Sequence, residues 1–323
     1  MTIVVDDDLL KAFEEQLDPS RPEESPMPAK VLGYGEISTV FEILQEEQAD
    51  IAFKRMPLFD TMAQVESYES LYERYNEQLM KIGLQIPEYG ATHIVTDSGR
   101  IVLYLYQKKQ PPDAIGNKVI HKVSNEECFS LVRHVLRELN KVWKFNNKHR
   151  GKLEVAIDGQ VSNWSVQEIN PNNPSIGRDT RLEYLDTSTP LMRENGKELL
   201  DALLFLKPTP PLMRWVLKRF YLQDILDRYY DLRRVCLDLV ANFLKEQRSD
   251  LVPGLIDVTN EFFRNEAAME HMVPLTPAEV KRYYDSDAST WRLYLRLRRM
   301  HRFVGTKVLR RYYPYILPGR IVR

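Results

Sequence analysis

The sequence predicts an α+β fold in which a strand-rich part is followed by a mainly helical part. Three observations carry this prediction: β-type runs fill much of residues 31–106, one helical stretch interrupts them at 63–82, and helical periodicity dominates after about residue 124. Strands grouped first and helices grouped afterwards are typical of α+β proteins. The crevice between two such parts is a natural place for a ligand.

The composition is that of an ordinary globular chain, with 43% hydrophobic and 28% charged residues in 323. Its length fits one large domain or two lobes. The sequence shows no apolar run long enough to cross a bilayer, and the start MTIVVDDDLL lacks the pattern of a secretory signal. Two distant cysteines, Cys128 and Cys236, make neither a disulfide framework nor a zinc site. We therefore expect a cytoplasmic protein.

The net charge of −1 hides an asymmetry between the two ends of the chain. Residues 1–25 hold eight acidic side chains, whereas residues 291–323 hold ten lysines or arginines and no acid. The plain interpretation of the basic tail is a solvated helix face. The sharper one is a site for phosphate, an acidic partner or a membrane surface. The tail has interleaved aromatics but no recognised nucleic-acid motif, so nucleic-acid binding is the least favoured hypothesis.

Residues 1–28 form an acidic, proline-rich segment that we expect to be peripheral. A short helix is predicted over residues 6–17, and four prolines between 19 and 28 then favour a linker. Strands follow at 31–44 (with a glycine turn in the middle), 51–56, 91–96 and 100–106. The helix at 63–82 keeps its apolar residues close to one face and ends at Gly83.

Helices dominate the second part of the chain. Ser124 and Glu127 have capping-box spacing, and a helical period continues to about Asn146. Residues 191–323 show a helical pattern broken by prolines. Short strand-like pieces lie between these helices, at 153–157, 164–169 and 181–185.

Three pieces of sequence carry candidate chemistry. The first is the turn Gly33-Tyr34-Gly35 with the strand after it, where Ser38 and Val40 lie. Glycines in a strand turn let backbone N–H groups approach phosphate oxygens. The plain alternative is a hairpin turn. A dinucleotide fold does not fit, because another strand follows the turn where such a fold needs a helix.

The second piece is Ala52-Phe53-Lys54, on the next strand. Antiparallel pairing brings Lys54 back towards the glycine turn, where its charge can neutralise phosphate. A carboxylate would keep the ammonium charged and oriented. We favour Glu73 of the following helix for this role, with Glu69 as the alternative and Glu77 left open. The plain interpretation leaves these glutamates in solvent.

The third piece joins Asp158 and Asn163, five residues apart in a loop, to Asp186 at the end of a later strand. Carboxylate and amide oxygens are hard ligands that suit the Mg²⁺ carried by a nucleotide. A second carboxylate can accept a proton from an attacking hydroxyl. The plain interpretation of Asp158 is a turn residue.

Taken in order, the pieces G-Y-G-E-I-S-T-V, A-F-K, D-G-Q-V-S-N and D-T-S-T-P resemble the motifs of the eukaryotic-type kinase superfamily, in particular its aminoglycoside phosphotransferase and choline kinase branch. The resemblance covers residues 31–190 by motif. It implies a bilobal fold, with a five-stranded N-lobe that includes one helix over 29–106 and a mainly helical C-lobe over 107–323. ATP would bind at the hinge near Leu105, Tyr106 and Gln107.

The resemblance also implies roles for single residues. Lys54 would hold the phosphates and Glu73 would orient it. Asp158 would be the base, and Asn163 and Asp186 would hold Mg²⁺. The remaining nucleotide contacts would come from Gly33, Gly35, Ser38, Val40 and Ala52.

The chain departs from the family pattern at four places. Ser38 replaces a glycine, Ala156-Ile157 precede Asp158, Gln160 stands where relatives carry a cation, and no Phe-Gly follows Asp186. A neutral amide at position 160 would stabilise the transferred phosphate less well. The leading hypothesis is an ATP-dependent phosphotransferase with an unidentified, small-molecule hydroxyl acceptor. The alternative is a pseudokinase that binds nucleotide without turnover.

Overall fold

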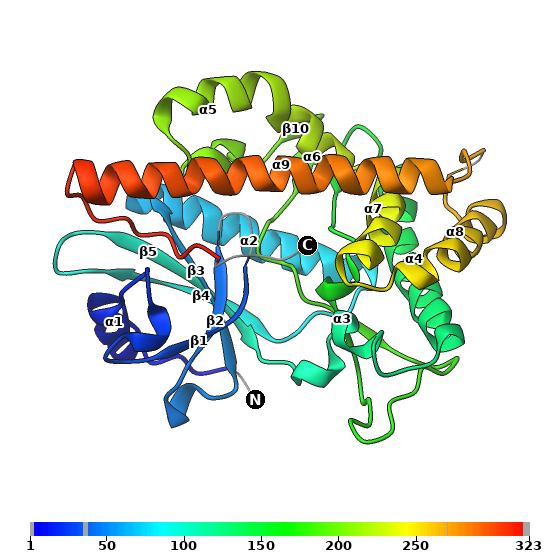
Figure 1. Cartoon of the computed structure of the whole chain (residues 1–323), viewed down its shortest axis with the longest axis horizontal. Helices are drawn as coiled ribbons and strands as arrows, with labels where there is room; N and C mark the ends of the chain where they lie inside the picture. The colour runs from blue at the N-terminus through cyan, green and yellow to red at the C-terminus, as the bar shows by residue number, and fades with distance from the viewer. Residues whose placement is uncertain (1–2, 35–37, 270, 319–323) are drawn as a thin grey trace.

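A computed structural model of the chain describes residues 3–34, 38–269 and 271–318. Antiparallel strands form one sheet in the first third of the chain, and helices make up most of the remainder (Figure 1). The protein therefore has the predicted α+β, kinase-like bilobal fold, with a strand-rich N-lobe and a mainly helical C-lobe. None of the helices in the described part of the chain is long and apolar enough to span a membrane.

The N-lobe sheet has five strands in the order β1-β2-β3-β5-β4, and each pairs antiparallel with its neighbours. Helix α2 (Met62–Ile82) connects β3 to β4 and ends at Gly83, whose φ of 97° is a left-handed value that glycine adopts at little cost. The predicted strand pattern is confirmed. The strands are β1 (Ala29–Tyr34), β2 (Thr39–Ile43), β3 (Ile51–Phe59), β4 (Tyr89–Val95) and β5 (Ile101–Lys108).

The predicted N-terminal helix is present as α1 (Asp7–Gln16). Asp6 caps its N-terminus, because the Asp6 side chain accepts a hydrogen bond from the N–H of Leu9. It is not peripheral. Leu10 and Phe13 are fully buried, and the Phe13 ring lies 5.3 Å from that of Phe41 on β2. The sheet's outer face needs an apolar cover, and α1 supplies it.

A buried ion pair fixes α1 to the sheet. Two nitrogens of the Arg55 guanidinium each lie 2.6 Å from a carboxylate oxygen of Glu14, and the Tyr104 hydroxyl donates to the same carboxylate. Both charged side chains are almost completely buried, at 2% and 0% exposure. The third nitrogen of Arg55 donates to the carbonyl of Pro314, near the other end of the chain. One guanidinium thus joins α1, β3 and the C-terminal segment.

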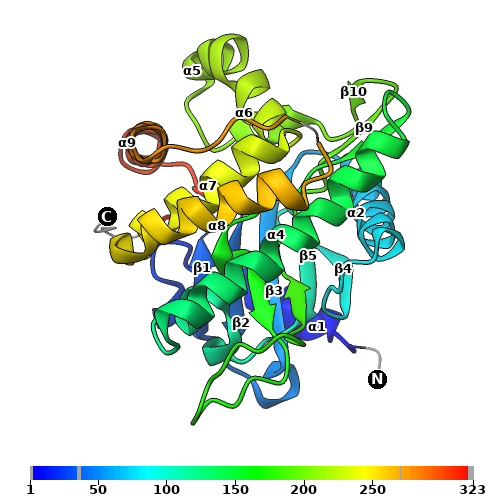
Figure 2. The same cartoon turned by 90° about the vertical axis from the view of Figure 1, so that its right-hand side faces the viewer.

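The C-lobe is organised around α4 (Asn125–Lys148). This helix begins with the predicted capping box, in which Ser124 and Glu127 each satisfy the other's backbone N–H. Figure 2 shows α7 and α8 packed beside α4. The other helices are α3 (Gly116–Val119), α5 (Pro211–Leu217), α6 (Gln223–Arg228), α7 (Leu232–Lys245), α8 (Val252–Asn265) and α9 (Pro277–Phe303).

Two small sheets interrupt the helices, and one of them lies where we predicted a helix. Residues 192–198 form a hairpin that pairs with β6, although we expected helix after residue 191. Asn195 and Gly196 take φ values of 51° and 75°, as a tight hairpin turn requires. The strands are β6 (Leu153–Val155), β7 (Trp164–Val166), β8 (Leu182–Tyr184), β9 (Met192–Glu194) and β10 (Lys197–Glu198).

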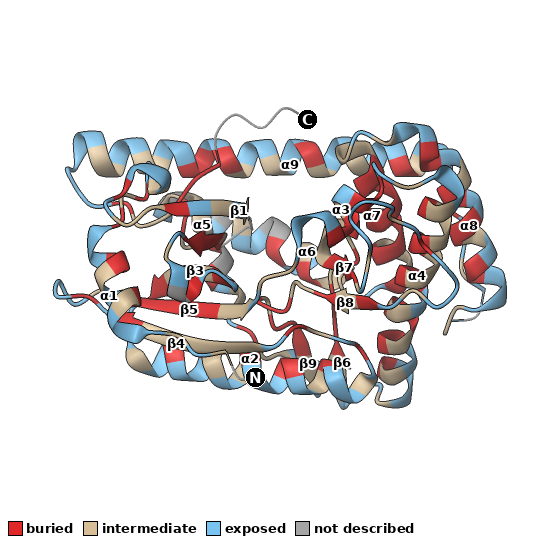
Figure 3. Ribbon diagram, turned by 90° about the horizontal axis from the view of Figure 1, so that it is seen from below, coloured by how far each residue is buried: buried red, intermediate tan, exposed pale blue. Residues whose placement is uncertain are grey.

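Helix α9 runs along the whole length of the molecule, from the C-lobe helices to the N-lobe (Figures 1 and 3). Buried and exposed residues alternate along it, which is the pattern of a helix with one covered face (Figure 3). After α9 the chain turns back, and the carbonyl of Pro314 reaches Arg55 of β3. The segment after α9 also contacts the C-lobe, where the Tyr313 hydroxyl donates to the carbonyl of Pro208.

Candidate functional site

Lys54 lies at the junction of the two lobes, opposite Val40 on β2 and Leu105 on β5. Its Nζ is 2.6 Å from Oδ1 of Asp186 and 2.5 Å from Oγ of Ser188. Asp186 is 132 residues away in sequence. The side chains are 17% and 28% exposed, so the pair is partly shielded from water. The structure thus brings together the lysine and the aspartate that the sequence placed in one site.

The pairing of the strands shows which of the predicted nucleotide-contacting residues lie on the same face of the sheet. Directly opposed residues share a face of the sheet, so Val40, Lys54 and Leu105 project to the same side. Ala52, two residues before Lys54, and its partner Gln107 lie on that side as well. These five positions could line one face of a bound nucleotide.

Tyr106 lies on the other face of the sheet, where its ring packs 6.5 Å from that of Phe53. The expected hinge is also displaced. Strand β5 continues to Lys108, which pairs with Ile51, and so residues 105–107 lie inside the sheet. The chain leaves the sheet after Lys108, because the prolines at 111 and 112 cannot supply the N–H groups that a further strand needs.

The glycine turn is described only in part. Gly35 lies outside the described residues. Gly33 is opposite Val40, and a Cβ placed on it would meet no atom within 4 Å. Ser38 is buried at the start of β2. Gly33 therefore leaves open space at the position where the resemblance would place a phosphate.

The predicted partner of Lys54 on α2 is wrong. Glu73 is exposed, and Glu69 lies 3.2 Å from Nδ1 of His93. Glu77 is exposed as well and pairs with Lys81. The carboxylate beside Lys54 is that of Asp186, because α2 is rotated so that its tyrosines and not its glutamates face the site.

These tyrosines hold the loops of the site in place. The Tyr68 hydroxyl donates to the carbonyl of Ser188 at 2.7 Å, and the Tyr75 hydroxyl donates to the carbonyl of Ala156 at 2.7 Å. Both rings are nearly inaccessible to solvent. From the sequence, Tyr68 and Tyr75 are simply part of the apolar face of the helix at 63–82, since nothing in one sequence shows where a buried hydroxyl points.

The loop of Asp158 is folded back on itself. Oδ1 of Asp158 accepts a hydrogen bond from the N–H of Gln160, and its carbonyl accepts one from Nδ2 of Asn163 at 3.4 Å. The carbonyl of Asn163 in turn accepts a hydrogen bond from the N–H of Leu185, the neighbour of Asp186. The predicted residues Asp158, Asn163 and Asp186 therefore belong to one cluster.

The electrostatics of this cluster favour a protonated Asp158. Burial raises the pKa of its carboxyl to about 8, and the negative charges of Asp238 and Asp186 act in the same direction. The N–H of Gln160 and the guanidinium of Arg228 oppose this rise. A carboxyl with this pKa gives up its proton near neutral pH, the range in which a general base works best.

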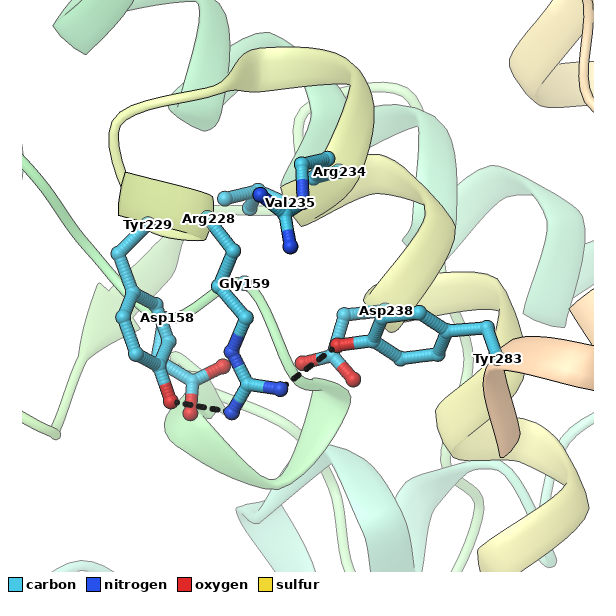
Figure 4. Close-up of a pocket in the computed structure, with 8 residues that line it drawn as sticks. All are labelled: Asp158, Gly159, Arg228, Tyr229, Arg234, Val235, Asp238 and Tyr283. Atoms are coloured by element: carbon cyan, nitrogen blue, oxygen red, sulfur yellow. Dashed lines mark hydrogen bonds between the residues drawn. The ribbon is translucent and has the colours of Figure 1, made fainter. Parts of the chain in front are cut away.

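Arg228, at the end of α6, lines a small pocket together with Asp158 (Figure 4). Its guanidinium donates hydrogen bonds to the hydroxyls of Tyr229 and Tyr283, at 3.0 and 3.2 Å. Figure 4 shows it between the carboxylates of Asp158 and Asp238. This cation was not predicted. Asp238 could have been found from the sequence, since a carboxylate that interrupts the apolar run from Val235 to Val240 is unusual in a buried helix.

The side chain of Gln160 contacts α7. Its Nε2 donates to Asp238 at 3.1 Å, and its Oε1 accepts from Asn242 and from Nζ of Lys245, at 3.3 and 3.2 Å. Relatives in the resembled family carry a cation at the position of Gln160. Here the neutral amide of Gln160 contacts a cation, the ammonium of Lys245. Helix α7 supplies that ammonium from a distant part of the sequence.

The comparisons place the chain in a family. The model of a family of unknown function, DUF6206, matches residues 14–302. The chain belongs to this family. The DUF6206 match begins within α1 and ends within α9, so it includes both lobes.

No curated protein sequence matches this DUF6206 chain. A solved structure to which it is similar is the GDP complex of wild-type aminoglycoside 2'-phosphotransferase-IIIa. The identity is 12% and the TM-score 0.32, over 74% of this chain and 93% of that one. The kinase-like description of the DUF6206 fold given above follows from the strand order and the two-lobed arrangement.

Proposed function

We propose that the protein is a Mg-ATP-dependent phosphotransferase that acts on a hydroxyl group of a small molecule. It would be an atypical member of the kinase-like superfamily, of the aminoglycoside phosphotransferase and choline kinase type. The observation that carries the proposal is the contact between Lys54 and Asp186, 2.6 Å long, next to the loop of Asp158. A lysine from the sheet thus meets Asp186 of the helical lobe, and the strand end that carries Asp186 is hydrogen-bonded to the loop of Asp158 and Asn163.

The residues present fit Mg²⁺ that arrives with a nucleotide. Within the described residues, no group of three or more histidine, cysteine, aspartate or glutamate side chains could hold a metal by itself. Mg²⁺ is usually bound by one or two protein oxygens together with phosphate and water. Asp186 and the amide oxygen of Asn163 would supply such ligands, and the ion would neutralise charge on the phosphates.

The chain's own groups would do the remaining work. Lys54 would exchange Asp186 for the phosphate oxygens of the nucleotide. Asp158 would take the proton of the acceptor hydroxyl as the hydroxyl oxygen bonds to the γ-phosphorus and ADP leaves. Tyr75 and Tyr68 would hold the two loops at the correct separation, because positioning provides much of the rate in phosphoryl transfer.

Two cations support transfer despite the neutral Gln160. Nζ of Lys245 lies 3.2 Å from Oε1 of Gln160, and Arg228 lies beside Asp158. Either can place positive charge near the transferred phosphoryl group, which relatives achieve with a residue at position 160 itself. We therefore favour the active enzyme.

A pseudokinase remains the second candidate, and one observation favours it. With a pKa raised to about 8, the Asp158 carboxyl is mostly protonated at pH 7, and in that state it accepts no further proton. A nucleotide-binding protein without turnover would tolerate this condition.

Mg-ATP should raise the melting temperature, since a ligand that binds only the folded state stabilises it. Lys54→Ala should reduce this rise. Lys30→Ala is a matched control, because Lys30 lies on the same sheet with a 61% exposed side chain. No shift with ATP, ADP or GTP at saturating levels would refute the nucleotide site.

The two aspartates then separate enzyme from pseudokinase. Asp186→Asn should weaken metal-dependent nucleotide binding and abolish turnover together. Asp158→Asn should leave nucleotide binding nearly unchanged and lower transfer by roughly 10²-fold or more. ATP consumption across a metabolite library is the readout. Normal Mg-ATP binding with no consumption in any condition would establish the pseudokinase.

A further inference from the structure

The C-terminal half of α9 exposes a row of large apolar side chains. Phe303 and Val308 are 62% and 63% exposed, and Leu293 and Met300 are 46% and 47% exposed. Their spacing of three to seven residues keeps them near one side of the helix and of the short helical turn after it, Val304–Val308. Side chains of this size are usually covered when they occur together.

Basic residues accompany this row. Arg296 and Lys307 are exposed at the same helical spacing, and Arg310 and Arg311 follow directly. The sequence has no acidic residue from 291 to 323. Within the described residues, no carboxylate lies within 4 Å of the charged groups of these four side chains. We call the surface made by Leu293, Arg296, Met300, Phe303, Val304, Lys307, Val308, Arg310 and Arg311 the basic–apolar face.

The helix under this face is anchored on its other side. Leu295 and Arg298 are buried, and the Tyr313 hydroxyl reaches the carbonyl of Arg298. His301 contacts the carbonyl of Pro208 through Nδ1 at 3.1 Å. The exposed side chains therefore project from a fixed helix and not from a loose end of the chain.

We propose that the basic–apolar face binds the surface of an anionic lipid bilayer. Phe303, Met300 and Val308 would enter the boundary between headgroups and acyl chains. The arginines and Lys307 would contact lipid phosphates and carboxylates, with their aliphatic stems along the apolar region. A helix lying flat on the membrane needs this combination of apolar and cationic side chains on one side.

Other occupants fit the face less well. A second copy of the chain would bring two clusters of like charge together, with no acidic residue in this region to offset them. A nucleic acid would match the charge, but its phosphate backbone would leave Phe303, Met300 and Val308 without an apolar partner. Of these three occupants, the bilayer surface alone satisfies both kinds of side chain.

Vesicle flotation tests the proposal with the full chain and no nucleotide. The protein should float with phosphatidylcholine vesicles that contain phosphatidylserine, bind much less to pure phosphatidylcholine, and be released in part at high salt. Replacing Phe303 and Val308 together by serine should lower binding at least tenfold. The control variant, with Leu44 and Val95 changed to serine, removes apolar side chains of 49% and 47% exposure elsewhere and should bind normally.

The charge component is tested separately. Changing Arg296, Arg310 and Arg311 to alanine should lower binding to anionic vesicles about a hundredfold, at about fivefold for each arginine. A matched triple variant at exposed sites elsewhere carries the same charge change and should bind almost as wild type does. Its positions are Arg150, Arg178 and Arg264.

Three outcomes would overturn the proposal. Wild-type protein that does not float with anionic vesicles excludes a bilayer surface as the occupant. Equal loss in both arginine variants means that only net charge matters. Self-association in solution that disappears in the Phe303/Val308 variant, without vesicle binding, identifies the face as an interface between copies.

Discussion

The hydroxyl of Tyr75 on α2 donates a hydrogen bond of 2.7 Å to the carbonyl of Ala156, two residues before Asp158. Both residues are buried, at 1% and 0% exposure, so no water can replace this bond. The helix of the N-lobe thus controls the position of the loop that carries the candidate base.

Tyr75→Phe should destabilise the fold, because it leaves the buried carbonyl of Ala156 without a donor. We expect a loss of about 1–3 kcal/mol in the free energy of unfolding, measured by denaturant titration. Tyr34→Phe is the control, since Tyr34 is 43% exposed, and it should change little. Equal stability of the two variants would show that the Tyr75 hydroxyl does not hold the loop.

Glu14→Ala should be strongly destabilising, by about 3–5 kcal/mol, because it leaves the guanidinium of Arg55 buried and unpaired. Glu23→Ala, at an exposed position of the same segment, should have almost no effect. Thermal or denaturant unfolding measures both. A small effect of Glu14→Ala would mean that α1 is peripheral after all.

The same pair predicts a loss of stability in acid. Burial alone would raise the pKa of Glu14, but the charge and hydrogen bonds of Arg55 and Tyr104 lower it below the usual range. A depressed carboxyl pKa contributes stability above the unfolded-state pKa of about 4.3, and this contribution is lost as pH falls through the folded-state value. Unfolding followed between pH 7 and pH 3, with Glu14→Gln for comparison, should show a wild-type loss that the variant lacks.

Asp158→Asn should stabilise the protein at neutral pH. The raised pKa of Asp158 makes the folded state hold a proton that the unfolded chain has released, so stability falls as pH rises from about 4 to about 8. Removing the carboxyl removes this penalty, on the order of 1 kcal/mol or more. The melting temperature at pH 7 should rise by roughly 2–4 °C per kcal/mol, and the difference should vanish near pH 4. An unchanged melting temperature at both pH values would contradict a raised pKa.

The pH dependence of turnover should follow Asp158 as well. If the ionised carboxylate is the base, kcat/KM rises with pH along an acid limb whose midpoint lies near 8. Asp238→Asn should move that midpoint to lower pH, because the Asp238 charge helps to raise the pKa. Arg228→Ala should move it upward, since Arg228 opposes the rise. An acid limb near pH 4 in all three proteins would exclude Asp158 as the base.

Lys245→Ala should lower phosphoryl transfer more than it lowers nucleotide binding, because the ammonium beside Gln160 would act on the transferred group. Gln160→Lys in the Lys245→Ala background should restore part of the rate by returning a cation to this place. Steady-state kinetics with ATP titration separates kcat from KM. Failure of the second change to restore any activity would argue that no cation is needed here.

Much of the fold could be predicted because its signals are local. Alternation and turn residues located the strands of the N-lobe, and the spacing of Ser124 and Glu127 located the start of α4. The hairpin at 192–198 was missed because each of its strands is only two or three residues long, too short for a periodic signal. The Asn195-Gly196 turn was the available indication.

The sequence by itself determined which residue types are available to the candidate site and in which order they come. Spacing along the chain is enough to place these residues on their elements. It puts Lys54 on a strand, Asp158 and Asn163 five apart in a loop, and Asp186 at the end of a strand. Backbone periodicity acts over a few residues, so it can be read from one sequence.

Only the tertiary structure decided which of these groups meet. Residues 72 and 73 of α2 differ by about 100° around the helix axis, so the orientation of the packed helix about its own axis decides whether a tyrosine or Glu73 faces Lys54. That rotation depends on how the apolar face of α2 packs against both lobes. The contact between Lys245 and Gln160, and the place of Arg228 between Asp158 and Asp238, depend in the same way on helices that pack from distant parts of the chain.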